Sequence, residues 1–202
     1  MKVIIDTSSL ISLVRYYIPF DSDKNFYDFI KSKIQNDEII VVDRVYDECR
    51  FNAKGLVLKS LDFLSDSTFL KNYKVPYKTE NLIIPIEWQK QFYHYLNNDF
   101  VNSVVKKNKG INDTEFENLK QKHLEDADMK MIILALNLLP QFEDLILITE
   151  ESENSNDGKV FNKIPSICAT LGINSMTLPS FLKIIEEIEV KIEPLSVDKF
   201  SI

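Results

Sequence analysis

The sequence is poor in glycine, cysteine and histidine, and each shortage excludes a class of site. The four glycines lie far apart, so the chain can form neither a GxGxxG turn nor a P-loop, and a nucleotide cofactor held by a glycine-rich loop is not expected; they are Gly55, Gly110, Gly158 and Gly172. The two cysteines, Cys49 and Cys168, are too few for a disulfide framework and predict a reducing compartment. The two histidines, His94 and His123, have no metal-type spacing to each other or to the cysteines.

Long apolar runs are absent as well. No run approaches the ~18–20 residues of a membrane span. The first six residues, MKVIID, already reach an acidic side chain at Asp6, so no apolar signal-peptide core is expected. We therefore expect a cytoplasmic protein that makes no membrane contact.

Basic residues are in the minority. The chain has 31 acidic and 24 basic residues, which gives a net charge of −7. This balance argues against non-specific binding of a polyanion over a broad surface. It leaves open a nucleic-acid enzyme whose acidic residues are gathered in one metal site.

The pattern along the 202 residues predicts a single α/β domain over residues 1–202 with a helical insert at about 65–112. Short β-branched runs predict strands at 2–6, 38–42, 144–149 and 173–177. Apolar stripes at helical spacing predict helices from about residue 7 to Pro19 and over 24–34, 43–51, 56–64, 87–105, 114–123, 127–138, 165–172 and 179–189. Thr7, Ser8 and Ser9 are expected to cap the first helix, and the basic stretch at 106–113 is expected to be a loop.

Acidic residues fall where the strands are expected to end. Asp6 closes the first strand, and Glu150 and Glu151 follow the third. Glu48 lies in the helix after the second strand, and Asp128 lies in the helix that leads into the third. Sites in open α/β sheets form outside the carboxyl ends of the strands, so these carboxylates are expected to meet at one end of the sheet.

Helical phase chooses between neighbouring acids. Glu48 is expected on the inward face of its helix and Asp47 further outward. Asp128 shares a face with Ile132, whereas Asp126 faces elsewhere and is a plausible N-cap. A carboxylate cluster without histidine or cysteine suits a hard cation, Mg²⁺ or Mn²⁺, which can activate a water for attack on a phosphodiester.

Four blocks of this sequence, taken in order, resemble the PIN-domain nucleases. They read VIIDTSSL around Asp6, VVDRVYDECR around Glu48, EDADMKMIILAL around Asp128, and LILITEE, which holds Thr149. The segment KIPSICATLGI that follows is similar to a bacterial subfamily of uncharacterised PIN-like proteins. The resemblance implies an α/β, three-layer fold in which helices flank a central, mostly parallel sheet of four or five strands.

The resemblance also implies a Mg²⁺- or Mn²⁺-dependent ribonuclease, often the toxin of a toxin–antitoxin pair. Its catalytic and metal-binding residues would be those matching the family's acids; these are Asp6, Glu48, Asp128 and Glu151, the last standing where the family usually has an aspartate. Residues with a supporting role would be Ser8, Asp126, Thr149 and Glu150. The implied partners are an RNA substrate, an antitoxin or other regulatory protein, and a second copy of the chain.

Two other functions compete with the nuclease. The glutamate in place of the late aspartate and the acidic net charge favour a PIN-like module that binds nucleic acid or protein without cleaving it. An aspartyl-phosphate enzyme acting through Asp6 ranks third, because Ser8 stands where a haloacid-type phosphatase has its second aspartate. The basic residues Lys106, Lys107 and Lys109 would contact a phosphate backbone only if they overhang the acids.

Overall fold

A four-stranded parallel sheet forms the centre of the protein. The computed structural model describes residues 1–152 and 158–185. The strands are β1 (Lys2–Ile5), β2 (Ile39–Ile40), β3 (Leu145–Ile148) and β4 (Asn174–Met176), in the spatial order β2-β1-β3-β4. The expected α/β class is confirmed, and the arrangement is consistent with a three-layer PIN-like fold.

The two central strands are apolar because both of their faces are covered. Ile4 on β1 pairs with Leu147 on β3, and neither side chain is exposed to solvent. The ladder continues past the last strand residue, since the backbone N–H of Asp6 donates to the carbonyl of Ile148 at 3.0 Å. Asp6 is therefore held at the carboxyl end of the sheet by its backbone hydrogen bond to β3.

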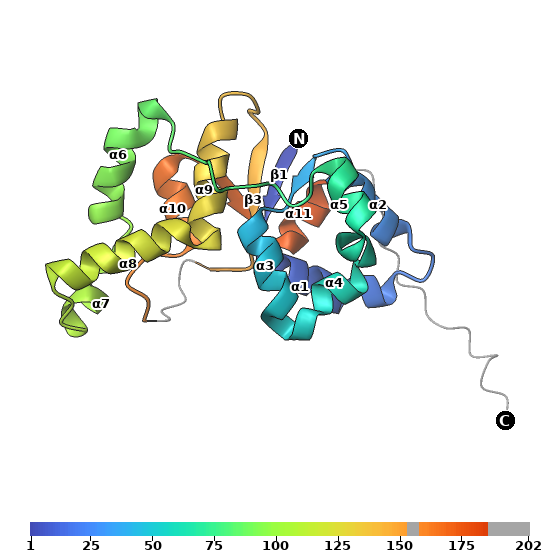
Figure 1. Cartoon of the computed structure of the whole chain (residues 1–202), viewed down its shortest axis with the longest axis horizontal. Helices are drawn as coiled ribbons and strands as arrows, with labels where there is room; N and C mark the ends of the chain where they lie inside the picture. The colour runs from blue at the N-terminus through green and yellow to red at the C-terminus, as the bar shows by residue number, and fades with distance from the viewer. Residues whose placement is uncertain (153–157, 186–202) are drawn as a thin grey trace.

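Helices cover both faces of the sheet. In Figure 1, α9 and α10 lie on one side of the strands, and α2 and α11 lie on the other. The α-helices are α1 (Thr7–Tyr16), α2 (Asn25–Gln35), α3 (Asp43–Phe51), α4 (Leu56–Ser60), α5 (Ser67–Tyr73), α6 (Ile86–Asn97), α7 (Ser103–Asn108), α8 (Asp113–Glu125), α9 (Ala127–Leu138), α10 (Ile164–Leu171) and α11 (Leu178–Ile184). Short 3-10 turns occur at η1 (Ile18–Phe20), η2 (Asn52–Gly55) and η3 (Asp62–Ser65).

Three predicted helices differ from the structure. The helix expected over 87–105 breaks after Asn97, because Val101 pairs with Phe161 in an isolated bridge and Asn102 caps the separate helix α7. The predicted helix over 56–64 breaks at Leu61 into α4 and η3. The helix predicted to reach residue 189 is described only to Ile184, and residues 186–189 lie outside the described part of the chain.

An extended segment, residues 74–85, connects the two helical regions by crossing the sheet (Figure 1). Tyr77 lengthens the β2 edge through hydrogen bonds to Val41 and from Asp43, both at 2.9 Å. Thr79, two residues after Tyr77, is buried. Within residues 1–152 and 158–185, no helix has both the length and the apolar character needed to cross a membrane.

Candidate functional site

The strand order defines a switch point between β1 and β3. From β1 the chain goes to β2 on one side, whereas β3 and β4 lie on the other. In parallel sheets the crevice outside such a point is where ligands bind. Asp6 comes directly after β1, and Thr149, Glu150 and Glu151 come directly after β3.

A cavity of about 350 Å³ opens at this switch point. Its walls come from the start of α1, the end of α3, the start of α9 and the segments on either side of residues 153–157. The lining residues are Asp6, Thr7, Ser8, Ile11, Glu48, Asn52, Asp126, Ala127, Asp128, Met131, Glu151 and Lys159. The structure thus brings the four predicted acids, Asp6, Glu48, Asp128 and Glu151, to one cavity, as helical phase and strand ends suggested.

Asp6 is the most constrained of the four acids. Its Oδ2 accepts hydrogen bonds from the hydroxyls of Ser8 and Thr149, both at 2.7 Å, and its Oδ1 accepts from the backbone N–H of Ser9 at 2.6 Å. Asp6 is therefore the N-cap of α1, a position that the sequence analysis wrongly assigned to Thr7, Ser8 or Ser9. A carboxylate oxygen can accept two hydrogen bonds, so these contacts leave one acceptor position on Oδ1.

Glu48 faces the cavity but is not buried. Its Oε2 accepts a hydrogen bond from the Thr7 hydroxyl, while Oε1 accepts none within the described residues. Glu48 points toward the cavity, as predicted for the inward face of its helix. The side chain nevertheless remains exposed to solvent, so the expectation that it is buried is wrong. Asp47 lies on another side of α3, 3.8 Å from the Arg50 guanidinium.

Asp128 is partly buried and has no hydrogen-bond or ion-pair partner among the described residues. Burial raises the pKa of its carboxyl to about 7, and the nearby negative charge of Glu151 adds to the rise. Glu48 and Asp6 also raise this pKa, whereas the ammonium of Lys159 lowers it. The four carboxylates therefore lie close enough to repel one another. This repulsion, together with burial, raises the free energy of the ionised form of Asp128.

The two glutamates after β3 have different surroundings. The Oε1 of Glu150 accepts from the backbone N–H of Leu178 at 2.8 Å, at the start of α11, and Glu150 does not line the cavity. The Oε2 of Glu151 accepts from the N–H of Ile164 at 3.1 Å, at the start of α10, while its side chain lines the cavity. Thr149 supports this turn, since its hydroxyl accepts from the Glu151 N–H at 3.1 Å.

Asp126 occupies the N-cap position of α9 without capping the helix. Its side chain accepts no hydrogen bond from the first turn, and its Oδ2 lies 3.4 Å from Nδ1 of His123. The His123 ring is buried and stacked on Phe161, with the ring centroids 4.2 Å apart. Burial lowers the pKa of His123, although Asp126 opposes this effect. Asp126 is thus an exposed residue at the cavity rim.

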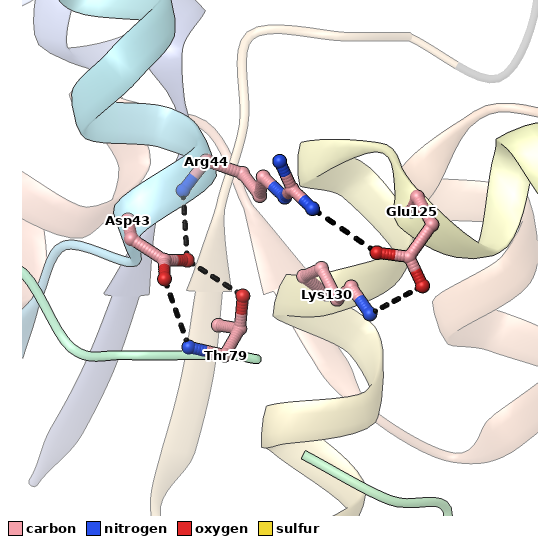
Figure 2. A network of polar contacts seen from close by, with 5 residues as sticks. All are labelled: Asp43, Arg44, Thr79, Glu125 and Lys130. Atoms are coloured by element: carbon pink, nitrogen blue, oxygen red, sulfur yellow. Dashed lines mark hydrogen bonds and ion pairs between the residues drawn. The ribbon is translucent and has the colours of Figure 1, made fainter. Parts of the chain in front are cut away.

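A polar network ties the two walls of the cavity together (Figure 2). On α3, the Asp43 carboxylate accepts from the backbone N–H of Thr79 at 3.0 Å and from its hydroxyl at 2.6 Å. The next residue, Arg44, donates to Glu125 at 3.1 Å, and Glu125 also accepts from the buried Lys130 of α9 at 2.9 Å. These contacts connect α3, which carries Glu48, with the crossing segment and with the α8–α9 junction, which precedes Asp128.

The predicted lysines lie elsewhere. Lys106 and Lys107 belong to α7, Lys109 is its C-cap, and none lines the cavity. The first part of the expected loop is helical because the Asn102 side chain caps α7, accepting from the Val105 N–H at 3.1 Å. The ammonium of Lys106 lies 3.6 Å from the centroid of the Phe116 ring on α8. The 13 residues of α8 extend roughly 20 Å between α7 and the start of α9.

Six residues that line the cavity were not predicted as site residues; they are Thr7, Ile11, Asn52, Ala127, Met131 and Lys159. Lys159 supplies a cation, Asn52 an amide and Ile11 an apolar surface. Lys159 follows a polar stretch of sequence without periodicity, so no sequence signal predicts its position at the cavity. Ile11 could have been found, because it lies one helical turn after Ser8 on the predicted first helix. Asn52 lies four residues after Glu48, one residue beyond the helix predicted over 43–51.

The acids surround the cavity without forming a ready coordination shell. Within residues 1–152 and 158–185, no three His, Cys, Asp or Glu side chains are arranged so that they could hold a metal ion. Glu48 and Glu151 each have three rotatable side-chain bonds, so their carboxylates can approach Asp128 without movement of the backbone. The all-oxygen donor set and the unpartnered charge of Asp128 fit a hard divalent cation.

The fold and cavity define an α/β protein with an acidic site at the switch point of a parallel sheet. Residues 85–188, slightly more than half of the 202-residue chain, match the family described as "Domain of unknown function (DUF4411)", and the chain belongs to this family. The matched region contains Asp128 and Glu151, whereas Asp6 and Glu48 precede it. No curated protein and no solved structure has a significant match to the chain.

Proposed function

We propose that the protein is a Mg²⁺- or Mn²⁺-dependent ribonuclease that hydrolyses phosphodiester bonds in the acidic cavity. One observation carries the proposal: the unpartnered, partly buried carboxylate of Asp128 faces three further carboxylates across a cavity of about 350 Å³. Such an arrangement is costly unless a cation binds there. The resemblance of the four acidic blocks to PIN-domain nucleases supports the same reading.

The residues that would hold the cation are those with unused oxygen atoms. Asp128 has both carboxylate oxygens available, Glu48 has Oε1, and Glu151 has the oxygen that does not cap α10. Asp6 offers the remaining acceptor position on Oδ1. When bound, a divalent cation supplies Lewis-acid activation of a water and neutralises negative charge on the phosphodiester.

The chain itself positions these oxygens. Ser8 and Thr149 fix the Asp6 carboxylate from α1 and β3, and Thr7 fixes Glu48. Lys159 brings a positive charge to the same cavity, where it can attract a phosphate group. The site is thus built on elements whose mutual geometry is set by the sheet and by the network around Glu125.

Cleavage of labelled single-stranded RNA and DNA of mixed sequence, with Mg²⁺, Mn²⁺ or EDTA, tests the proposal. We expect RNA cleavage that EDTA abolishes and that Asp128→Asn or Glu48→Gln reduces at least a hundredfold. Asp47→Asn is the matched control, because Asp47 lies on the same helix but does not line the cavity. Wild-type protein that cleaves no nucleic acid with either metal would overturn the proposal.

A binding module without catalytic activity is the second candidate. It is favoured by the absence, in the described part of the chain, of a preformed group of three metal ligands, and by the capping roles of Asp6 and Glu151. In that case the protein would bind nucleic acid or a protein partner without any change in the length of the RNA. Binding that neither Mn²⁺ nor Asp128→Asn alters would select this function.

A further inference from the structure

His123, in the last turn of α8, is a buried histidine with one ring nitrogen that lacks a hydrogen-bond partner. The residue is 8% exposed, and its Nε2 is enclosed without a donor or acceptor among the described residues. The other nitrogen, Nδ1, lies 3.4 Å from the Asp126 carboxylate. Because a buried, unpaired polar atom destabilises a fold, packing alone would favour an apolar side chain here. The histidine therefore needs another explanation.

The ring of His123 belongs to an aromatic stack on α8. Phe116 lies seven residues earlier, two turns along the same face of the helix. Phe161, from the segment before α10, has its ring centroid 4.2 Å from that of His123 and 5.9 Å from that of Phe116. Seven residues of helix rise roughly 10 Å, which is the space that one inserted ring fills. Phe161 is therefore held between two rings of α8.

Backbone hydrogen bonds hold the same segment in place. The N–H of Asn102 donates to the carbonyl of Val160 at 2.8 Å. The N–H of Asn162 donates to the carbonyl of Phe100 at 2.7 Å. The residues on both sides of Phe161 are thus bonded to the connection between α6 and α7, and these two amides report whether the segment keeps its position.

Lys159 connects this segment to the acidic cavity. It comes two residues before Phe161 and lines the cavity. Its positive charge lowers the pKa of Asp128 and also lowers the pKa of His123, so its ammonium lies near both side chains. The contact between His123 and Phe161 therefore determines where the chain places this lysine.

The neutral form of the His123 ring fits its surroundings better than the charged form. The charged groups that face it from other elements are Asp126, at the start of α9, and Lys159. Burial lowers the pKa of His123 and Lys159 lowers it as well, whereas Asp126 raises it. Protonation would create an N–H at Nε2 that has no acceptor among the described residues, near the ammonium of Lys159. Acid therefore favours separation of the ring from the segment that carries Lys159.

We infer that His123 is a positioning residue: its neutral ring holds residues 159–163 against α8, so that Lys159 is presented to the acidic cavity, and its protonation loosens them. The inference rests on the proposed function in one respect, because Lys159 is taken to attract the substrate phosphate. Affinity for the substrate would then fall in acid through a histidine that is not among the residues lining the cavity.

Amide hydrogen exchange of the full-length wild type, followed by NMR in EDTA from pH 5 to 7.5, tests the position of the segment without a substrate. The ordinary pKa of histidine is 6.5, and the fold lowers it. Between these values, each lower pH unit should reduce the protection of the Asn102 and Asn162 amides about tenfold, because the open state binds a proton that the closed state does not. The Val3 amide, which donates to Glu38 at 2.8 Å, should stay better protected than both.

Two results of this measurement would overturn the inference. One is protection of the Asn102 and Asn162 amides that does not fall with pH. The other is equal protection of these amides and of Val3, which would mean that the segment opens only when the whole protein unfolds.

Three variants assign the effect to His123 and Lys159. His123→Phe keeps an aromatic ring but cannot be protonated, so protection of the same amides should no longer depend on pH. His94→Phe is the matched control, because His94 is the other histidine of the chain and its side chain is 68% exposed; it should respond as wild type does. Lys159→Met should raise the pKa of His123, read from its C2–H proton resonance, since a nearby positive charge is removed.

The variants can also contradict the inference. Loss of protection in acid by His123→Phe, as in wild type, or an unchanged His123 pKa in Lys159→Met would each overturn it. The wild-type exchange and the Lys159→Met titration leave His123 in place, so they decide the question even if His123→Phe does not fold.

Cleavage kinetics separate this inference from the proposed function. Lys159→Met and His123→Ala should each raise the KM for single-stranded RNA about 10- to 150-fold with little change in kcat, the range of one lost hydrogen bond to a charged group. The double variant should be no worse than the weaker single variant, and additive losses would show that His123 does not act through Lys159. Wild type that cleaves nothing but shows the expected exchange would retain the positioning role and reject the nuclease.

Discussion

Asp128→Asn should stabilise the metal-free protein at neutral and alkaline pH. The folded state raises the pKa of Asp128 from 3.8 to about 7, through burial and through the charge of Glu151. Between these values the folded state keeps a proton that the unfolded state has lost, so stability falls as pH rises. Above pH ~7 Asp128 is ionised in both the folded and the unfolded state, so its destabilisation of the folded state no longer changes with pH.

The magnitude follows from the width of this window. Each pKa unit corresponds to 1.36 kcal/mol, so the change to asparagine should relieve on the order of 4 kcal/mol at pH 8. Water that enters the cavity and rotation of Glu48 and Glu151 reduce this figure, which makes it an upper limit. Asparagine has nearly the same shape and no charge, so the packing of α9 is preserved.

Urea unfolding in EDTA, followed at several pH values from 4.5 to 8.5, measures the effect. The free energy of unfolding of Asp128→Asn minus that of wild type should be smallest at the acid end and grow by about 1.36 kcal/mol per pH unit toward pH 7. Asp47→Asn, on the same helix as Glu48 but outside the cavity lining, is the control for the loss of one negative charge. If the free energy of unfolding of Asp128→Asn minus that of wild type does not change with pH, or decreases as pH rises, the charge of Asp128 does not destabilise the folded state and the argument is refuted.

Three other predictions concern the same site and its walls. Mn²⁺ at a hundredfold excess over its Kd should stabilise wild type by ~2.7 kcal/mol, which is a rise in melting temperature of about 5–10 °C, and Asp128→Asn should lose this response in differential scanning fluorimetry. Asp6→Asn should lower stability by about 1–2 kcal/mol in urea unfolding, because an amide nitrogen cannot accept the hydrogen bonds that the carboxylate accepts. Glu125→Gln should cost about 1 kcal/mol in the same assay, since the buried ammonium of Lys130 loses its charged partner; an unchanged midpoint would mean that solvent screens this pair.

Much of the fold could be predicted because it depends on local patterns. The apolar runs at Lys2–Ile5 and Leu145–Ile148 gave the central strands, and the acids that follow them had to lie at one edge of a parallel sheet. The choice of Asp128 over Asp126 needed only the phase of α9, and the structure places Asp128 inward and Asp126 at the exposed rim.

What sequence patterns missed depends on contacts between distant segments. The break between α6 and α7 occurs where Val101 pairs with Phe161. Because Phe161 is distant in sequence, the residues 98–102 alone do not predict this break. Lys159 lines the cavity but follows a polar stretch of sequence without periodicity. Asp126 looked like a cap by its position, but the stacked ring of His123 offers its side chain another partner.

The hydrogen bonds distinguish acids that have a structural role in the fold from Asp128, for which the described residues show no such role. Asp6 caps α1, Glu150 receives a hydrogen bond from the start of α11, and Glu151 receives one from the start of α10. An acid at each of these places stabilises the fold whether or not a metal binds, so their presence at the strand ends is weak support for catalysis. Asp128 contributes no such contact in the described part of the chain, and burial beside other carboxylates makes its charge costly. Natural sequences keep a locally unfavourable residue where function requires it, so the case for a cation site depends most on Asp128.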